Sequence, residues 1–280
     1  MRELIKPNTM IESGYINGYL NYTGSKFKLL DQILPEMDYS KDHFIDLFTG
    51  SFCVGANVVD KYKKVLANDI ISELVGIHRE LLESDDIIER TKILCPSKTD
   101  SAGFLNLRES FNREKSPEKL WALILSCNSN FMRFNKQFFF NQTFGKRTFN
   151  TNTQNKIDEF TKRVRPYKDK ITFISKHFNE IKISKPCMVY IDPPYSNSEA
   201  GYSAYWGKED DTKLYEYCKE LDKNGSSFMM SGVLSHDGKS CLLLDKLIAD
   251  GLKYKKLEFN YNKVSKSGKK DTTEIIIMNY

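Results

Sequence analysis

Short apolar runs that end in turn-forming or acidic residues recur along the chain and predict buried β-strands. They cover residues 43–48, 64–67, 171–174, 187–191, 227–231, 254–261 and 273–278. The last two runs flank the Gly/Lys/Ser-rich segment 263–271, so they predict an antiparallel hairpin.

Helical spacing appears between these runs. After Asp69, Leu74, Val75, Leu81 and Leu82 recur on one helical face. Ser116 followed by Pro117 predicts the start of another helix, because serine is a good N-cap and proline is tolerated in the first turn. Residues 84–155 contain helical patterns and a polar-aromatic hairpin but no buried strand, so we interpret them as an insertion.

Strands that alternate with helices predict an α/β fold with a mostly parallel sheet covered on both faces. Such sheets bind ligands beyond the carboxyl ends of their strands. We therefore expect one domain formed by residues 1–83 and 156–280, with residues 84–155 inserted as a second, helical unit that carries a β-hairpin.

Composition changes this picture little. Charged residues make up 28% of the chain and the net charge is +5, which permits a polyanionic partner without requiring one. The six cysteines are scattered without metal-ligand spacing, so we expect reduced, mostly buried thiols and no metal site. The first 18 residues contain no apolar run of signal-peptide or membrane length, so a cytoplasmic protein without membrane association is expected.

The segment Asp192-Pro193-Pro194-Tyr195 follows directly on the predicted strand 187–191. The prolines end the strand and fix the backbone. Asp192 and the Pro193 carbonyl can then accept the two hydrogens of an amino group on a flat ring, while Tyr195 stacks on the ring. The alternative is an ordinary strand-to-loop turn with a buried tyrosine.

A second motif, Asp46-Leu47-Phe48-Thr49-Gly50-Ser51, also lies at a strand end, and Asp69 follows Gly50 by nineteen residues. An acid about 20 residues after such a glycine turn can hold ribose hydroxyls. The spacing of Gly50 and Gly55 does not match the NAD fingerprint, and no Lys-Ser/Thr pair follows Gly55, which excludes a P-loop. Taken alone, the motif could be an ordinary turn.

A third segment, residues 129–147, combines amides, aromatics and basic side chains. Arginine can make paired hydrogen bonds to guanine, and aromatic rings can replace a flipped base in the stack. The alternative is an amphipathic hairpin packed by its own aromatics.

Together these motifs resemble, in order, those of the Dam family (D12 class) of bacterial and phage DNA adenine methyltransferases. The matching segments are Asn21 to Lys26, Asp46 to Gly50, Leu66 to Ile70, Phe144 to Arg147, and Asp192 to Tyr195. The resemblance implies a Rossmann-like class I methyltransferase core with an inserted DNA-recognition domain, and S-adenosylmethionine as cofactor. It also implies an adenine amino group as acceptor, within GATC in double-stranded DNA.

The resemblance assigns roles to individual residues. Cofactor binding falls to Tyr22, Lys26, Asp46, Phe48, Gly50, Asp69, Phe178 and Asp192, and catalysis to Asp192, Pro193, Pro194 and Tyr195. DNA binding falls to Ser129, Asn130, Phe131, Arg133, Asn135, Thr143, Lys146 and Arg147, with Arg133 reading a guanine. The chain departs from the family at Ser51, where a second glycine is usual, and at Thr143, where proline is usual.

The sequence therefore predicts a DNA adenine methyltransferase of a bacterial cell or phage-infected host. Two alternatives stay open: a methyltransferase that acts on RNA or on a protein amide, and a DNA-binding regulator that keeps the fold without turnover. Whether a restriction endonuclease accompanies the enzyme is also left open.

Overall fold

A computed structural model describes residues 14–22, 24–194, 206–236, 238–258 and 272–280. Its strands are β1 (His43–Asp46), β2 (Lys64–Asn68), β3 (Ile171–Ile174), β4 (Met188–Ile191), β5 (Ser227–His236), β6 (Lys239–Ser240), β7 (Lys253–Leu257) and β8 (Thr272–Met278). They form one sheet in the order β3-β2-β1-β4-β5-β8-β7, and the short β6 pairs with the end of β5. The α/β prediction is confirmed.

Strand direction divides this sheet into two parts. Strands β1 to β5 run parallel, whereas β8 is antiparallel to both β5 and β7. The pairing of β7 with β8 confirms the predicted C-terminal hairpin, although the segment 263–271 lies outside the described residues. Strand β5 continues to His236, beyond the predicted end at Ser231, because its outer half pairs with β8 and β6.

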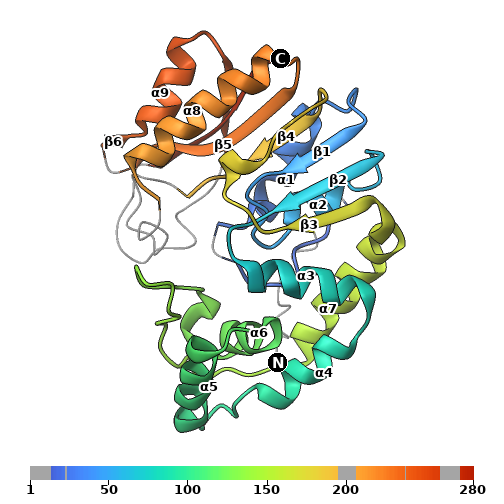
Figure 1. Cartoon of the computed structure of the whole chain (residues 1–280), viewed down its shortest axis with the longest axis vertical. Coiled ribbons are helices and arrows are strands. Elements are labelled where there is room, and N and C mark those ends of the chain that lie inside the picture. Colours follow the sequence, from blue (N-terminus) through green and yellow to red (C-terminus); the bar gives the residue numbers. More distant parts are fainter. Residues whose placement is uncertain (1–13, 23, 195–205, 237, 259–271) are drawn as a thin grey trace, which may run out of the picture.

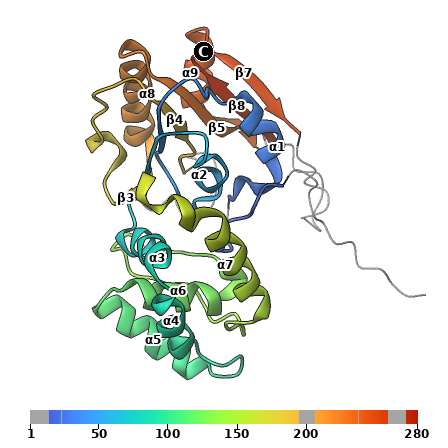
Figure 2. The same cartoon turned by 90° about the vertical axis from the view of Figure 1, so that its right-hand side faces the viewer.

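Helices cover both faces of the sheet (Figure 2). The helices are α1 (Leu30–Ile33), α2 (Cys53–Val58), α3 (Ser72–Glu83), α4 (Asp86–Leu94), α5 (Ser101–Arg113), α6 (Pro117–Ser126), α7 (Thr151–Val164), α8 (Lys208–Lys223) and α9 (Leu242–Ala249). Helices α8 and α9 pack on one face, and α1, α2 and α7 on the other. Among the described residues, no helix is long and apolar enough to cross a membrane.

The two helices expected from the sequence are present. All four apolar positions predicted for the first of them are buried in α3. At the start of α6, the Ser116 hydroxyl accepts a hydrogen bond from the Lys119 amide, and Pro117 occupies the first helical position. Both helices therefore form for the reasons that their sequences indicate.

Helices α4, α5 and α6 gather at the end of the molecule away from β8 and β7 (Figure 1). Their buried side chains belong to the same apolar cluster as those of α3 and α7, so no polar layer separates them from the sheet domain. The boundaries 84 and 155 of a separate recognition unit stay a prediction.

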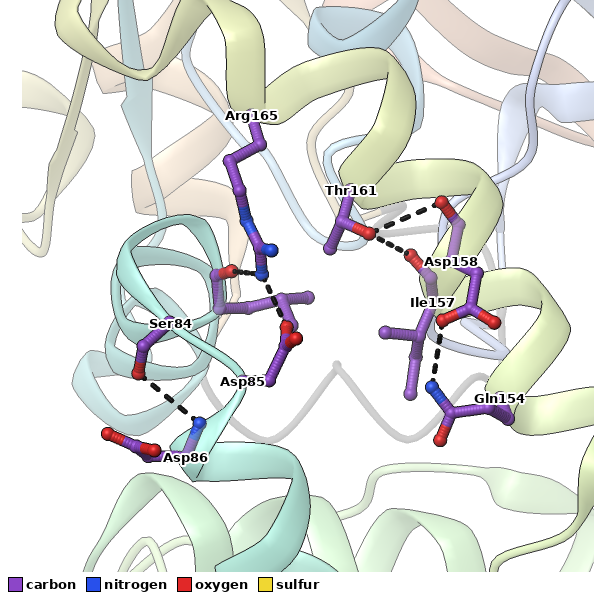
Figure 3. A network of polar contacts seen from close by, with 9 residues as sticks. Ser84, Asp85, Asp86, Gln154, Ile157, Asp158, Thr161 and Arg165 are labelled. Carbon is purple, nitrogen blue, oxygen red and sulfur yellow. Dashed lines mark hydrogen bonds and ion pairs between the residues drawn. The ribbon is translucent and has the colours of Figure 1, made fainter.

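A group of hydrogen bonds joins the segment between α3 and α4 to the end of α7 (Figure 3). The chain enters the helical part at the first of these places and leaves it at the second. Arg165, directly after α7, donates to the Leu81 carbonyl at 2.8 Å and to the Asp85 carboxylate at 2.7 Å. The amide of Asp86 donates to the Ser84 hydroxyl at 3.2 Å. The start of α4 is thereby anchored beside the end of α7.

Candidate active site

A cavity of about 250 Å³ opens at the carboxyl ends of the parallel strands. Its walls come from the segments that follow β1, β2, β3 and β4, as expected for an α/β sheet. The cavity brings together all eight predicted cofactor residues, namely Tyr22, Lys26, Asp46, Phe48, Gly50, Asp69, Phe178 and Asp192. Pro193 and Pro194 also line it, whereas Tyr195 lies outside the described residues.

Gly50 lines this cavity at a turn that leaves no room for a side chain. Its φ is +47°, and a Cβ there would lie 2.9 Å from the Tyr22 ring. A side chain at this position would therefore be strained and would displace Tyr22.

The Asp69 carboxylate joins two loops of the cavity. One oxygen accepts from the Gly50 amide at 3.0 Å and the other from the Ile71 amide at 3.0 Å. Burial raises the pKa of Asp69 to about 6, although the backbone donors oppose the shift. The Ile70 amide is a further backbone donor to this carboxylate, and the acceptor capacity that is left can serve a ligand hydroxyl.

Asp46, the last residue of β1, forms a hydrogen bond to the start of α2. Its carboxylate accepts from the Gly55 amide at 3.3 Å, and burial raises its pKa to about 7. Asp46 therefore ties the end of β1 to the first turn of α2, and one of its oxygens is used there rather than by a ligand.

Sequence reasoning missed His78, which supports Gly50 from behind. The Gly50 carbonyl can only accept, so His78 Nε2 carries the proton of this 2.8 Å bond, and Nδ1 accepts from the Tyr19 hydroxyl at 2.8 Å. Burial lowers the pKa of His78 to about 4, so the ring stays neutral. No local motif marks this histidine, because it reaches the loop from the middle of α3.

Ser51 replaces the second glycine of the family pattern, and the structure accommodates it. Its φ is not positive. The neighbouring Gly18 leaves the space, since a Cβ at Gly18 would lie 2.8 Å from the Ser51 carbonyl oxygen. Serine therefore imposes no strain on this turn.

Lys26 and Asp192 form a buried ion pair in the cavity wall. Lys26 Nζ donates to Asp192 Oδ2 at 2.6 Å and to the Gly24 carbonyl at 3.0 Å. Burial alone would lower the pKa of Lys26, but the Asp192 carboxylate raises it above its ordinary value. The pair thus connects the first motif of the chain to the Asp-Pro-Pro segment.

Three aromatic rings form one corner of the cavity. Phe178 lies 5.6 Å from Phe48 and 5.5 Å from Trp206, measured between ring centroids. Sequence reasoning missed Trp206, which precedes α8 and carries no local motif. The three rings are tilted against one another, and together they offer an apolar, aromatic surface for a heterocyclic ring.

The segment between α6 and α7 contains two isolated antiparallel bridges, Cys127 with Phe144 and Phe134 with Phe140. Arg133 spans this hairpin-like loop: its Nε donates to the Asn141 side chain at 2.9 Å, and its Nη2 donates to the Asn141 carbonyl at 3.0 Å. One edge of the guanidinium is therefore fixed within the loop, which orients the rest of it.

Two predicted DNA contacts serve the loop itself. The buried Asn130 amide donates to the Ile124 and Leu125 carbonyls, and its oxygen accepts from Arg147 at 2.6 Å. The Asn135 side chain accepts from the backbone of Gln137 and Phe139. The other predicted contacts are half-buried at Phe131 and exposed at Ser129, Thr143, Lys146 and Arg147.

All six cysteines are free, and five of them are buried. The described part of the chain contains no cluster of three or more His, Cys, Asp or Glu side chains that could hold a metal ion.

Comparison with known proteins gives the family. The model of D12 class N6 adenine-specific DNA methyltransferases matches residues 22–264. Modification methylase StsI of Streptococcus sanguinis is 31% identical over 95% of this chain and 43% of its own length, and type II methyltransferase M.FokI of Planomicrobium okeanokoites is 30% identical over 99% and 46%.

The chain thus spans less than half the length of these relatives. A relative of similar size is type II methyltransferase M.MjaIII of Methanocaldococcus jannaschii, which is 23% identical over 79% of this chain and 86% of its own. Because the family match covers most of the chain, the protein belongs to the D12 class of N6 adenine-specific DNA methyltransferases.

Proposed function

We propose that this chain transfers a methyl group from S-adenosylmethionine to the exocyclic amino nitrogen of adenine in double-stranded DNA. The observation that carries the proposal is that Asp192 and Pro193 line the same cavity as Lys26, Asp69 and the Gly50 turn.

The residues that line the cavity are suited to bind the cofactor. The Asp69 oxygens can accept from ribose hydroxyls, and the aromatic corner of Phe48, Phe178 and Trp206 suits an adenine ring. When bound, S-adenosylmethionine supplies an electrophilic methyl group on its sulfonium.

Asp192 and the Pro193 carbonyl accept the two amino hydrogens of the target base. These bonds turn the nitrogen lone pair out of conjugation with the ring and make it a better nucleophile. Asp192 orients the amino group rather than removing a proton before attack, because a carboxylate is too weak a base to deprotonate a neutral amino group.

The target adenine leaves the duplex to reach this cavity, since its amino group is otherwise engaged in base pairing. Tyr195 stacks on the flipped base in this proposal. The loop between α6 and α7 contacts the duplex through Arg133 together with Ser129, Phe131, Thr143, Lys146 and Arg147, while Asn130 and Asn135 hold the shape of the loop.

The direct test is transfer of a tritiated methyl group from S-adenosylmethionine to duplex DNA, followed by nucleoside analysis. N6-methyladenine is the expected product. Labelled RNA or protein with unlabelled DNA would support the corresponding alternative, and cofactor binding without any transfer would support a silent regulator.

The titration of Asp69 predicts how cofactor binding depends on pH. Ribose hydroxyls donate to the ionised carboxylate, so binding requires the deprotonated form. With a pKa of about 6 in the free protein, affinity should be constant well above this pH and fall by about tenfold per unit below it. Calorimetric titration of the parent between pH 5 and 8 measures this.

Two variants control this prediction. Asp69→Asn removes the titrating group and should bind the cofactor more weakly at neutral pH, with a flatter profile below pH 6. Asp69→Ala should weaken cofactor binding more than DNA binding, by about 1.5–3 kcal/mol. Unchanged affinity in both variants would mean that Asp69 does not hold the ribose.

The recognition sequence proposed from the family pattern is GATC, with Arg133 on a guanine. Mapping the methylated adenines in a library of duplexes tests it. If the main products lie outside GATC, the proposed recognition sequence is wrong, whereas the proposed reaction is unaffected.

Since similar proteins include a modification methylase, we also propose a companion restriction endonuclease, and the neighbouring genes test this.

A further inference from the structure

Three side chains, Tyr190, Ser231 and Asp192, are joined by hydrogen bonds at the wall of the cavity, which Tyr190 and Asp192 line. Ser231 Oγ donates to Asp192 Oδ1 at 2.9 Å, and the Tyr190 hydroxyl lies 2.9 Å from the same Ser231 Oγ. Both Tyr190 and Ser231 are buried, with exposed fractions of 1% and 0%. Ser231 therefore contacts both Asp192 and the Tyr190 hydroxyl away from bulk water.

The direction of these bonds follows from the chemistry of the groups. An ionised carboxylate only accepts hydrogen bonds, so the single proton of Ser231 points at Asp192. Ser231 Oγ must then accept from Tyr190. The hydrogen bond from Tyr190 to Ser231 and the one from Ser231 to Asp192 thus both point toward the carboxylate.

The sheet fixes the positions of the two donors. Tyr190 on β4 lies opposite Met229 on β5, and Ser231 stands two residues further on the same face of β5. Lys26 holds the other carboxylate oxygen from outside the sheet. The plane of the Asp192 carboxylate is therefore set by donors from two separate elements.

We propose that Ser231 is a positioning residue for methyl transfer, which orients the Asp192 carboxylate toward the amino group of the target base and is itself held by Tyr190. The inference rests on the proposed function, in which Asp192 accepts an amino hydrogen. Ser231 does not contact the base or the cofactor, so its effect falls on the rate of the chemical step.

The first test is single-turnover methyl transfer by Ser231→Ala with saturating S-adenosylmethionine and DNA. The rate should fall roughly tenfold, because a hydrogen bond to a charged group is lost, while the dissociation constants of both ligands stay within twofold of the parent. A rate within twofold of the parent would overturn the proposal. Equal loss of rate and of ligand affinity would also contradict it, by indicating a merely structural role.

The matched control is Ser227→Ala. Ser227 is a buried serine on the same face of the same strand, and its hydroxyl also donates to a carboxylate, that of Asp38, away from the cavity. This variant should retain the parent rate. A loss of rate equal to that of Ser231→Ala would show that any buried serine of β5 gives the effect, and would contradict the proposal.

The direction of these two hydrogen bonds allows a double-mutant test. Tyr190→Phe keeps the ring and removes the donor to Ser231, so it should lower the rate by a smaller factor. In Ser231→Ala/Tyr190→Phe the loss should equal that of Ser231→Ala alone, because in the proposal Tyr190 holds Asp192 through Ser231. Losses that multiply would contradict this order of action.

Crystal structures of the parent and Ser231→Ala give a readout that needs no turnover. Without the serine donor, the Asp192 carboxylate should rotate or occupy more than one orientation while Lys26 keeps its contact. An unchanged single orientation would overturn the proposal. A parent that holds Asp192 as described but does not methylate DNA would instead contradict the proposed function.

Discussion

Replacing Asp192 by alanine is expected to reduce methyl transfer to less than a few per cent of the parent rate. The variant removes the acceptor that aligns the amino group, and loss of one such preorganised hydrogen-bond partner typically costs about 10²- to 10³-fold in rate. The measurement is tritium transfer to duplex DNA by the purified, folded protein. Folded Asp192→Ala with more than a few per cent of parent activity would refute the catalytic assignment.

The alanine variant also removes the carboxylate that pairs with Lys26 Nζ at 2.6 Å, and the Lys26 side chain is only 7% exposed. Removing one member of a buried ion pair costs about 3–5 kcal/mol of stability, so thermal unfolding must be followed in parallel. Asp192→Asn separates the two effects, because it preserves the shape and one acceptor oxygen. A slow but folded Asp192→Asn supports a role in the reaction rather than in stability. Asp38→Asn, away from the cavity, should match the parent.

Much of the sheet could be predicted because parallel strands buried on both faces read as continuous apolar runs. Strands β1 and β4, which are buried along most of their length in the middle of the sheet, lie within the predicted runs for this reason. The outer half of β5 could not be predicted, since residues 232–236 form a strand only through pairing with β8 and β6.

The same distinction holds for the site. The residues that sequence reasoning found follow strand ends or belong to short motifs, so their positions could be inferred locally. Strand order and helix packing, which no local sequence pattern encodes, bring three further residues to the cavity region: Ser231, Trp206 and His78. Asn130 shows the converse: its motif suggested a base contact, but its amide is used by the α6 carbonyls.

Replacing Arg133 by alanine is expected to relax base preference at one guanine by roughly ten- to a hundredfold, because a paired arginine–guanine contact contributes about 1–3 kcal/mol of discrimination. Its Nε–Nη2 edge is bonded to Asn141, which leaves Nη1 and the second Nη2 proton able to meet guanine O6 and N7. Methylation of a duplex library by parent and variant, with the modified sites mapped, measures the preference at each base.

Two further variants distinguish base reading from attraction to phosphates. Asn141→Ala removes the bond to Arg133 Nε, so preference at the same base should weaken by a smaller factor while the charge stays. The exposed Lys146, changed to alanine, should instead weaken binding to all duplexes alike and reduce the salt-dependence slope by about 1. If Arg133→Ala behaves like Lys146→Ala, then Arg133 contacts the backbone and the guanine must be read elsewhere. If Asn141→Ala leaves the base preference unchanged, then the bond from Arg133 Nε to Asn141 does not orient the guanidinium toward the guanine.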